Sequence, residues 1–598
     1  MPSQRHRLSP NMLMGILLSA WGVLNLLQAN WTELANDEAY YWYFSQHLDW
    51  GYFDHPPMVA FLIWLTRGWI GGELGVRLIS VLLQPVGLYL FWTLLRPSKP
   101  SHRDAMIYFL ACFSLPLLQV YGILALPDAP LLFFTVVFLW AFKRFTEHDN
   151  WGHALLLAVA MALLMYSKYH GALVILFALL SCLRIFRSPK FYIAVLLAVL
   201  LYTPHLWWLY THDFVTLRYH LVDRTNGTGF DTNNLLGYLF ILLIAFHPLW
   251  LYHYGKGLVH WWRESLTGIR RTLFFVLTGF VAFFLFASLR DNIQAQWLLP
   301  ICFALVALLC DTARTNDRAY RHICTVSVAT AILWIAVRLL VLFNPLQLKG
   351  ELWNNKADNH ALARLADGRP VLFMQNYTAS CKYRFYTGGQ AYTLPYLYDR
   401  DSQWRYDDSD TAFTGKEVLV VLNENPYTDT LLLPGGRQVE YLSLPNYKPL
   451  RKVWIEAATP LCDTIDENGL LPVQLLVRNP YPYDLYSTDK EPLMITFLYR
   501  IDQRHQPEHH YPLTDTLHAH SDRNAPPDTV CFMVAASSLP PAGEYLFGFS
   551  LRRNTLRSCL NSERHLLQIE RPQGRIVIHE KERRSFRHQP TLHDNETL

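Results

Sequence analysis

The sequence predicts a mainly α-helical membrane protein of many spans, followed by an extracytoplasmic half that combines α/β and β-sandwich-like regions. Three observations support this fold class. Long apolar runs follow one another up to about Phe343, and many approach the roughly 20 residues that cross a bilayer. Only 17% of the residues are charged, against about 25% in soluble proteins. After Asn344 the composition becomes that of an ordinary polar globular chain.

Eleven apolar segments are candidate transmembrane helices. They are Met12–Gln28, Val76–Leu95, Ala105–Leu124, Ala129–Phe142, Ala154–Met165, Gly171–Leu183, Phe191–Tyr210, Leu235–Tyr254, Leu273–Leu289, Ala295–Leu309 and Ile323–Phe343. The first follows Arg5 and Arg7 as a signal peptide would, but no convincing cleavage site comes after it, so we interpret it as an uncleaved span. Val59–Ile70 is apolar but short, which favours a helix lying in the membrane interface.

The Lys and Arg residues between the spans give an orientation. Alternate loops are rich in basic residues, for example Arg184, Arg187 and Lys190, and the intervening loops hold far fewer. Because basic loops stay in the cytoplasm, the N-terminus is expected there. An odd number of spans then places the C-terminal half outside the cytoplasm.

Composition also narrows the classes of function. The formal net charge is only +4, which gives no reason to expect a nucleic-acid partner. The nine cysteines include no CxxC pair, so the sequence does not indicate a zinc finger. One disulfide among Cys462, Cys531 and Cys559 is left open.

The first predicted outer loop carries paired acidic residues among aromatic ones. Asp37 and Glu38 precede Tyr40 and Trp42, and Asp54-His55-Pro56-Pro57 follows. Acidic side chains beside a membrane are costly unless they have a use. Catalysis is one interpretation of Asp37, and a helix N-cap is the other. Asp54 likewise could cap the next helix, with Pro in its first turn.

Three further outer segments contribute candidate residues. Asp128 lies in Leu-Pro-Asp-Ala-Pro between two spans, where a turn or capping role is the alternative to function. Lys168 lies in Ser-Lys-Tyr-His, and its alternative is a lysine that extends to the interface. Gln296 and Trp297 begin the tenth span, where an interfacial tryptophan belt is the alternative.

Taken together, these segments resemble the PMT-type glycosyltransferases, which include protein O-mannosyltransferases and the aminoarabinose transferase of lipid A. The resemblance rests on Asp37-Glu38, the Asp54–Pro57 run, the Asp128 and Lys168 turns, and several supporting segments. Those are Gly72–Arg77, Pro204–Trp208, His212–Phe214, Arg218–His220, Tyr377–Ser380 and Phe385–Gly389. The resemblance covers about Asp37 to Gly389.

The resemblance implies a GT-C fold and a polyprenyl-phosphate sugar donor, with transfer to a protein, lipid or polysaccharide acceptor, by inversion, at the inner membrane of a bacterium. Asp37, with Glu38 beside it, would serve as the catalytic base. Lys168 would stabilise the leaving phosphate, followed by Arg218 and Arg290.

His55 stands where the lipid A transferases carry a lysine, which weakens a phosphate-binding role for it. A histidine there could instead ligate a metal or titrate. A divalent metal bridged by Asp54 and Asp128 is left open. Tyr40, Trp42, Gln296 and Trp297 would line the substrate-binding region.

The polar half divides into two predicted modules. Val371–Met374, a helix ending at Gly388-Gly389, and Glu417–Leu422 suggest a small α/β module over 344–445. Alternating runs such as Val473–Val477 and Tyr545–Leu551 suggest a β-sandwich-like module over 446–575. The membrane domain would cover 1–343, and 576–598 would be a disordered tail.

A transferase is the leading hypothesis, and a transporter or flippase of a lipid-linked saccharide is the alternative. A transporter typically carries ionisable residues near the middle of the membrane and repeated halves. Here the charges lie at the outer ends of the spans, and no mirrored halves are visible in the sequence.

Overall fold

The computed structural model divides the chain into two compact units, Met1–Asn359 and His360–Leu598. It describes residues 8–220, 231–264, 266–374, 376–395, 402–422, 429–488, 492–500, 508–520, 525–553, 556, 559–562 and 564–584.

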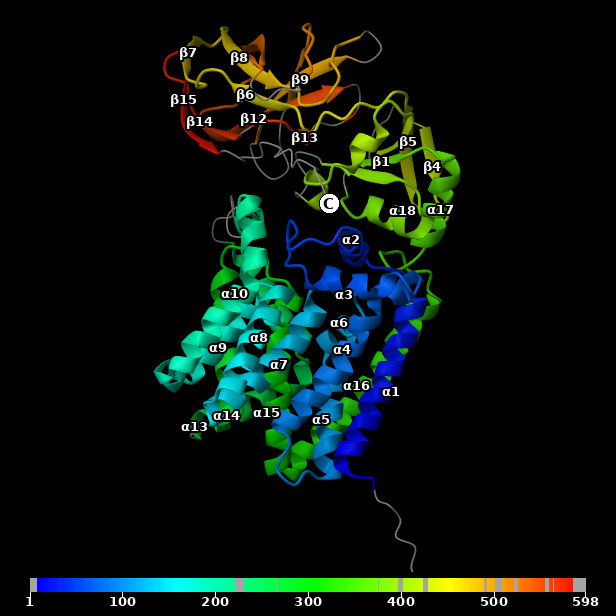
Figure 1. Ribbon diagram of the computed structural model, residues 1–598, viewed down its shortest axis with the longest axis vertical. Helices are drawn as coiled ribbons and strands as arrows, with labels where there is room; N and C mark the ends of the chain where they lie inside the picture. The colour runs from blue at the N-terminus through cyan, green and yellow to red at the C-terminus, as the bar shows by residue number, and fades with distance from the viewer. Residues whose placement is uncertain are drawn as a thin grey trace, which may run out of the picture. The chain divides into compact units, whose positions relative to one another are not determined.

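The first unit is a bundle of helices (Figure 1). They are α1 (Pro10–Trp31), α2 (Asn36–Phe44), α3 (Met58–Arg67), α4 (Gly72–Leu95), α5 (His102–Ser114), α6 (Pro116–Tyr121), α7 (Asp128–Glu147), α8 (Trp151–Ser167), α9 (Gly171–Ser181), α10 (Pro189–Thr211), α11 (Val215–Arg218), α12 (Thr232–Ala245), α13 (Leu251–Arg263), α14 (Gly268–Ala287), α15 (Cys302–Thr315) and α16 (Asp317–Phe343). The short 3-10 helix η4 (Ala295–Ile301) runs directly into α15.

Seven helices in the described part of the chain are long and apolar enough to cross a membrane, or eight if the bent pair α12–α13 is one span. The predicted number of eleven is therefore not confirmed. The run Ala105–Leu124 breaks at Pro116, where α6 begins, because proline removes a helical hydrogen bond. The runs at 154 and 171 form α8 and α9, of 17 and 11 residues.

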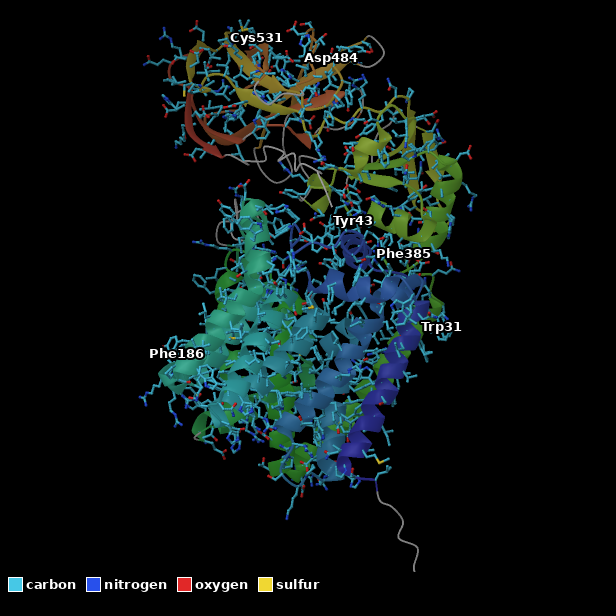
Figure 2. All side chains as sticks on the ribbon, viewed as in Figure 1. Trp31, Tyr43, Phe186, Phe385, Asp484 and Cys531 are labelled. Atoms are coloured by element: carbon cyan, nitrogen blue, oxygen red, sulfur yellow. The ribbon has the colours of Figure 1, made fainter. Side chains whose placement is uncertain are left out.

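The short helix α3 corresponds to the expected interfacial helix. It lies across the ends of the long helices, beside α2 (Figure 1). Its outward side chains include Trp64, 45% exposed, and Trp69 follows it at 71% exposed. Trp31, at the end of α1, extends outward from the bundle (Figure 2). Exposed tryptophans are typical of a membrane–water boundary.

The second unit begins with an α/β region. Its sheet has the order β2-β1-β3-β5-β4, from β1 (Val371–Met374), β2 (Ala391–Leu394), β3 (Val418–Leu422), β4 (Asp429–Leu432) and β5 (Gln438–Leu444). The first three strands are parallel and the last two antiparallel. Side chains of α17 (Asn355–Ala366) and α18 (Ala379–Thr387) share its core. Gly388 adopts φ 68° and ends α18, as the sequence predicted.

The remaining strands form two sheets around one apolar core, which is a β-sandwich. One sheet has the order β10-β9-β12-β14-β15-β7, with β13 (Cys559–Leu560) on β12, and the other has the order β11-β8-β6. The strands are β6 (Trp454–Ala457), β7 (Asp463–Asp466), β8 (Leu470–Arg478), β9 (Leu493–Arg500), β10 (Glu508–Pro512), β11 (Asp528–Ala535), β12 (Gly543–Arg553), β14 (Arg564–Glu570) and β15 (Arg575–Arg584).

Two details of the sequence predictions change here. Residues 576–584 were predicted to be a disordered tail, but they pair with β14 as strand β15, so that part of the prediction is wrong. Residues 585–598 lie outside the described part of the chain. Cys462 and Cys531 are free thiols, so no disulfide joins two of the three cysteines considered.

Candidate active site

Glu38 anchors the acidic loop to the bundle. Its carboxylate is fully buried and forms two hydrogen bonds with the Arg77 guanidinium, at 2.6 and 2.5 Å. It also accepts the backbone N–H groups of Ala35 and Ala125, at 3.0 and 2.9 Å. Arg77 in turn donates to the carbonyls of Ala29, Thr32 and Glu33. With these partners, Glu38 fits a structural role better than the predicted catalytic one.

Asp37 lies outside this buried pair. It lies in the first turn of α2 and is exposed. Adjacent residues of a helix point about 100° apart, so a buried Glu38 leaves its neighbour outside. The N-cap of α2 is Ala35. The backbone N–H group of Ala35 donates to the Glu38 carboxylate, and that of Asn36 donates to the Glu351 carboxylate. The capping alternative for Asp37 is therefore not favoured.

Asp128 and Lys168 form a buried ion pair. The Lys168 Nζ atom lies 2.7 and 2.9 Å from the two carboxylate oxygens of Asp128, and the residues are 5% and 3% exposed. Asp128 begins α7, and Lys168 directly follows α8. Asp37 is near enough for its charge to act on Asp128. The structure thus brings together three of the residues that the sequence singled out.

Tyr121 is a site residue that the sequence analysis missed. It ends α6, and its hydroxyl group donates to Gln296 Oε1 at 3.1 Å. The charges of Asp128 and Asp37 both act on this hydroxyl. Trp297, beside Gln296, packs between His170 and Phe284 at ring distances of 5.6 and 5.7 Å. A single tyrosine in an apolar run gave no signal in the sequence.

Arg338 is a second residue that the sequence did not single out, and its hydrogen bonds fix the position of α6. It is 5% exposed within α16 and donates to Gln119 Oε1 at 2.8 Å and to Asn25 Oδ1 at 2.8 Å. Asn25 then donates to the carbonyl of Gly122 at 3.3 Å. The network fixes both sides of Tyr121. An arginine inside an apolar span was the available signal.

The loop after α2 is docked on α10 and α11 through its backbone. The carbonyl oxygens of three alternate residues, 50, 52 and 54, lie 2.7, 3.1 and 3.0 Å from side-chain atoms of His205, Thr216 and His220. A side chain on Gly51 would collide with the Trp208 ring, so only glycine fits there. The loop therefore holds Asp54 and His55 in a fixed place.

Tyr169 joins this docked loop to the ion pair. Burial raises the pKa of Tyr169 well above its usual range, so its hydroxyl stays protonated and donates to His205 Nε2 at 2.9 Å. Because Trp50 offers a carbonyl, His205 Nδ1 carries the proton. Tyr169 follows Lys168 directly, so the docking of the loop and the position of the lysine are linked.

The other predicted residues lie in different surroundings. Asp54 is 2% exposed, and the half-buried His55 lies between Tyr41 and His220, at ring distances of 5.6 and 6.3 Å. Arg218 is half-buried at the end of α11, and Arg290 is exposed. Trp42 is half-buried. Tyr40 is 1% exposed and packs on Phe44, which does not favour contact with a substrate.

The residues considered for a divalent metal do not fit one well. Both oxygens of Asp128 are bound by the Lys168 ammonium, so a cation would have to displace that lysine. Among the described residues, no group of three or more His, Cys, Asp or Glu side chains could hold a metal ion. We therefore derive no step through a metal.

Comparisons with known proteins match parts of this chain. Residues 54–208 match the family model described as dolichyl-phosphate-mannose-protein mannosyltransferase. The chain is 30% identical over 225 residues to the lipid A galacturonosyltransferase RgtD of Rhizobium johnstonii, a match that covers 36% of this chain and 46% of the relative. It is 28% identical over 205 residues to the lipopolysaccharide core galacturonosyltransferase RgtA of the same organism, covering 33% and 41%. The chain thus matches less than half the length of these curated relatives.

A solved structure shares the fold. The crystal structure of ArnT from Cupriavidus metallidurans bound to undecaprenyl phosphate aligns with a TM-score of 0.53 at 15% identity, over 71% of this chain and 97% of ArnT. The apo crystal structure of ArnT gives 0.52 at 13% identity, with the same coverage. At this identity the likeness concerns the fold. The predicted resemblance to the PMT-type glycosyltransferases is thus confirmed over residues 54–208, and the chain has the GT-C membrane fold of ArnT.

Proposed function

We propose that this protein transfers a sugar from a polyprenyl-phosphate donor to an acceptor hydroxyl group at the extracytoplasmic face of a bacterial inner membrane. The observation that carries the proposal is the exposed Asp37 beside the buried Asp128–Lys168 pair. A base and a cation close together are what displacement of a phosphate by a hydroxyl requires. A glycolipid is the favoured acceptor, since the two relatives are named for lipid A and the lipopolysaccharide core.

Asp37 is the proposed base. Its exposed carboxylate accepts the proton of the acceptor hydroxyl as that oxygen attacks the anomeric carbon of the sugar. The new glycosidic C–O bond forms while the bond from the anomeric carbon to the phosphate oxygen breaks. Both electrons of the broken bond leave with the polyprenyl phosphate. A single displacement of this kind inverts the anomeric configuration.

Lys168 is the proposed partner of the leaving phosphate. An ammonium in a dry site stabilises negative charge more strongly than one in water. Asp128 holds the lysine in place through two contacts at 2.7 and 2.9 Å. Arg218, Arg290 and His55 are further candidates for the phosphate. Tyr121, Gln296, Trp297 and Trp42 are proposed to contact the substrates.

The proposal is tested with purified protein in lipid nanodiscs and a panel of polyprenyl-phosphate sugars, including a galacturonosyl donor. Release of polyprenyl phosphate is followed with a lipid A acceptor present, with and without a metal chelator. We expect turnover with one donor, dependent on acceptor and unchanged by the chelator. No turnover with any donor, together with passage of labelled donor across the bilayer of proteoliposomes, would contradict the proposal and support a flippase.

A further inference from the structure

Two glutamates cap helices that lie far from them in the sequence. The carboxylate of Glu351, a few residues before α17, accepts the backbone N–H group of Asn36, the first residue of α2, at 3.0 Å. The carboxylate of Glu33, a few residues before α2, accepts the backbone N–H groups of Asn355 and Lys356, which begin α17, at 2.6 and 3.4 Å. Each glutamate thus caps the helix that follows the other. All five residues lie in the first unit.

The start of α2 needs an acceptor from outside the helix. The first N–H groups of a helix have no carbonyl partner within it, and a carboxylate is a strong acceptor for them because it also meets the positive end of the helix dipole. The N-cap residue of α2 is Ala35, whose side chain has no acceptor. Glu351 therefore supplies from a distant segment what the N-cap residue itself lacks.

The side chain of Asn355 joins the two caps. Its amide nitrogen donates to Glu33 Oε2 at 2.9 Å and to the backbone carbonyl of Glu351 at 2.8 Å. We call Glu33, Glu351 and Asn355 the clasp. The backbone carbonyl of Glu33 also accepts from Arg77 at 2.9 Å, and Arg77 is the arginine that binds Glu38. The clasp is therefore continuous with the buried ion pair of the bundle.

The clasp holds the turn that carries Asp37. The residue before Asp37 is Asn36, whose N–H group is bonded to Glu351. The residue after it is Glu38, which is fully buried. The charge of Glu351 also acts on the Tyr121 hydroxyl, as the charge of Asp37 does. Both chain neighbours of the proposed base are thus held in place, one by the clasp and one by the bundle.

We propose that Glu351 and Glu33 are positioning residues for Asp37, and that the clasp sets where the carboxylate of this base meets the acceptor hydroxyl group. The inference rests on the proposed function, in which Asp37 takes the proton. Glu351 acts through the backbone of α2, and Glu33 acts by holding the segment that carries Glu351. Placement matters because a reacting group displaced by about 1 Å can lose about a hundredfold in rate.

The test measures sugar transfer and amide hydrogen exchange on the full-length protein in nanodiscs. Glu351→Ala removes the acceptor of the Asn36 N–H group, so kcat should fall about ten- to hundredfold, and the amides of α2 should exchange faster. KM for the donor should stay within about twofold, because the base acts in the transition state. Glu351→Gln keeps an oxygen that can accept the same N–H group, so it should restore most of kcat. Glu33→Ala should lower kcat and speed exchange at the start of α17.

Glu147→Ala, at an exposed glutamate of α7, is the matched control and should change neither readout, and thermal unfolding checks that each variant is folded. Unchanged kcat in Glu351→Ala, or lower kcat without faster exchange in α2, would overturn the proposal. A loss in Glu351→Gln as large as in Glu351→Ala would also overturn it, because the charge and not the cap would then matter. Wild-type turnover of Asp37→Asn would instead refute the proposed base, so the two failures are distinguished.

Discussion

Among the described residues of the first unit, two fully or nearly fully buried ion pairs differ in how many partners they have. Glu38 and Arg77 are saturated by each other and by five backbone groups, with both side chains fully buried. Among the described residues, Asp128 and Lys168 have no side-chain hydrogen-bond partner but each other, at 2.7 and 2.9 Å, and the charge of Asp37 acts on Asp128 and on the Tyr121 hydroxyl. The first pair can only fix the fold. In the proposed function, the second exchanges a partner when a charged ligand arrives.

A third buried cation extends this comparison. Arg338 is bonded to amide oxygens of Gln119 and Asn25 and, in the described part of the chain, has no carboxylate within ion-pair distance. Neutral partners leave the positive charge uncompensated, at a cost inside a membrane. The network of Arg338 holds the end of α6, which links this cation to the placement of Tyr121.

The largest expected effect is on the saturated pair. Arg77→Met leaves Glu38 buried without its cation and frees three carbonyl oxygens. Breaking a buried pair costs about 3–5 kcal/mol, so little folded protein should be recovered. Thermal unfolding in detergent measures this, with the exposed Arg290→Met as a control for removal of a charge. Full stability of Arg77→Met would remove the distinction between the pairs.

The Asp128–Lys168 pair should separate stability from activity. Lys168→Met leaves Asp128 buried and alone, so we expect a loss of about 3–5 kcal/mol together with loss of transfer. The double variant Asp128→Asn with Lys168→Met has no unpaired charge, and its stability should largely recover. Its activity should stay about 10²–10³ lower. Recovery of activity in the double variant would show that Lys168 does not act on the phosphate.

Arg338→Met tests the cation that is held by amides. Loss of its hydrogen bonds should cost about 1.5–3 kcal/mol and lower activity through α6, with the conservative variant Arg338→Lys restoring part of both. Arg321→Met, at an exposed position of the same helix, is the control. Stability and turnover are measured on each variant. A change no greater than that of Arg321→Met would mean that the network does not position Tyr121.

The smallest effect is expected at Tyr121. Tyr121→Phe removes the hydrogen bond to Gln296 and leaves the ring. Transition-state stabilisation should fall by about 1 kcal/mol, which lowers kcat/KM roughly fivefold. Stability should change little. The matched variant Tyr89→Phe, at a partly exposed position of α4, should leave kcat/KM unchanged. A loss of several hundredfold would instead make Tyr121 a group that takes part in the chemistry.

Much of the fold could be predicted because its signals are local. Length and apolarity give the long helices, and alternation with a period of two gives strands such as β8 and β12. The helices break at Pro116 and between α12 and α13. Whether the pieces on the two sides of a break cross the membrane as one span depends on how they pack. The last strand, β15, is strongly charged and gains its place by pairing with β14 on one side and with β7 on the other.

The candidate site could be predicted as a set of residues but not as pairs. Asp37 and Glu38 are neighbours in sequence, and only the packing of Arg77 decides which of them is buried. Asp128 and Lys168 are 40 residues apart, and the sequence suggested separate roles in metal and phosphate binding. Their contact shows that the Asp128 carboxylate and the Lys168 ammonium are bound to each other.

The most direct test of the central claim compares Asp37→Asn with Asp213→Asn, a matched change at another exposed aspartate of the membrane unit. Transfer is measured with the active donor after both variants are shown to unfold at the wild-type temperature. The account predicts that Asp37→Asn lowers kcat by about 10²–10⁴ while Asp213→Asn does not. Turnover of Asp37→Asn at the wild-type rate would contradict the assignment of Asp37 as the base.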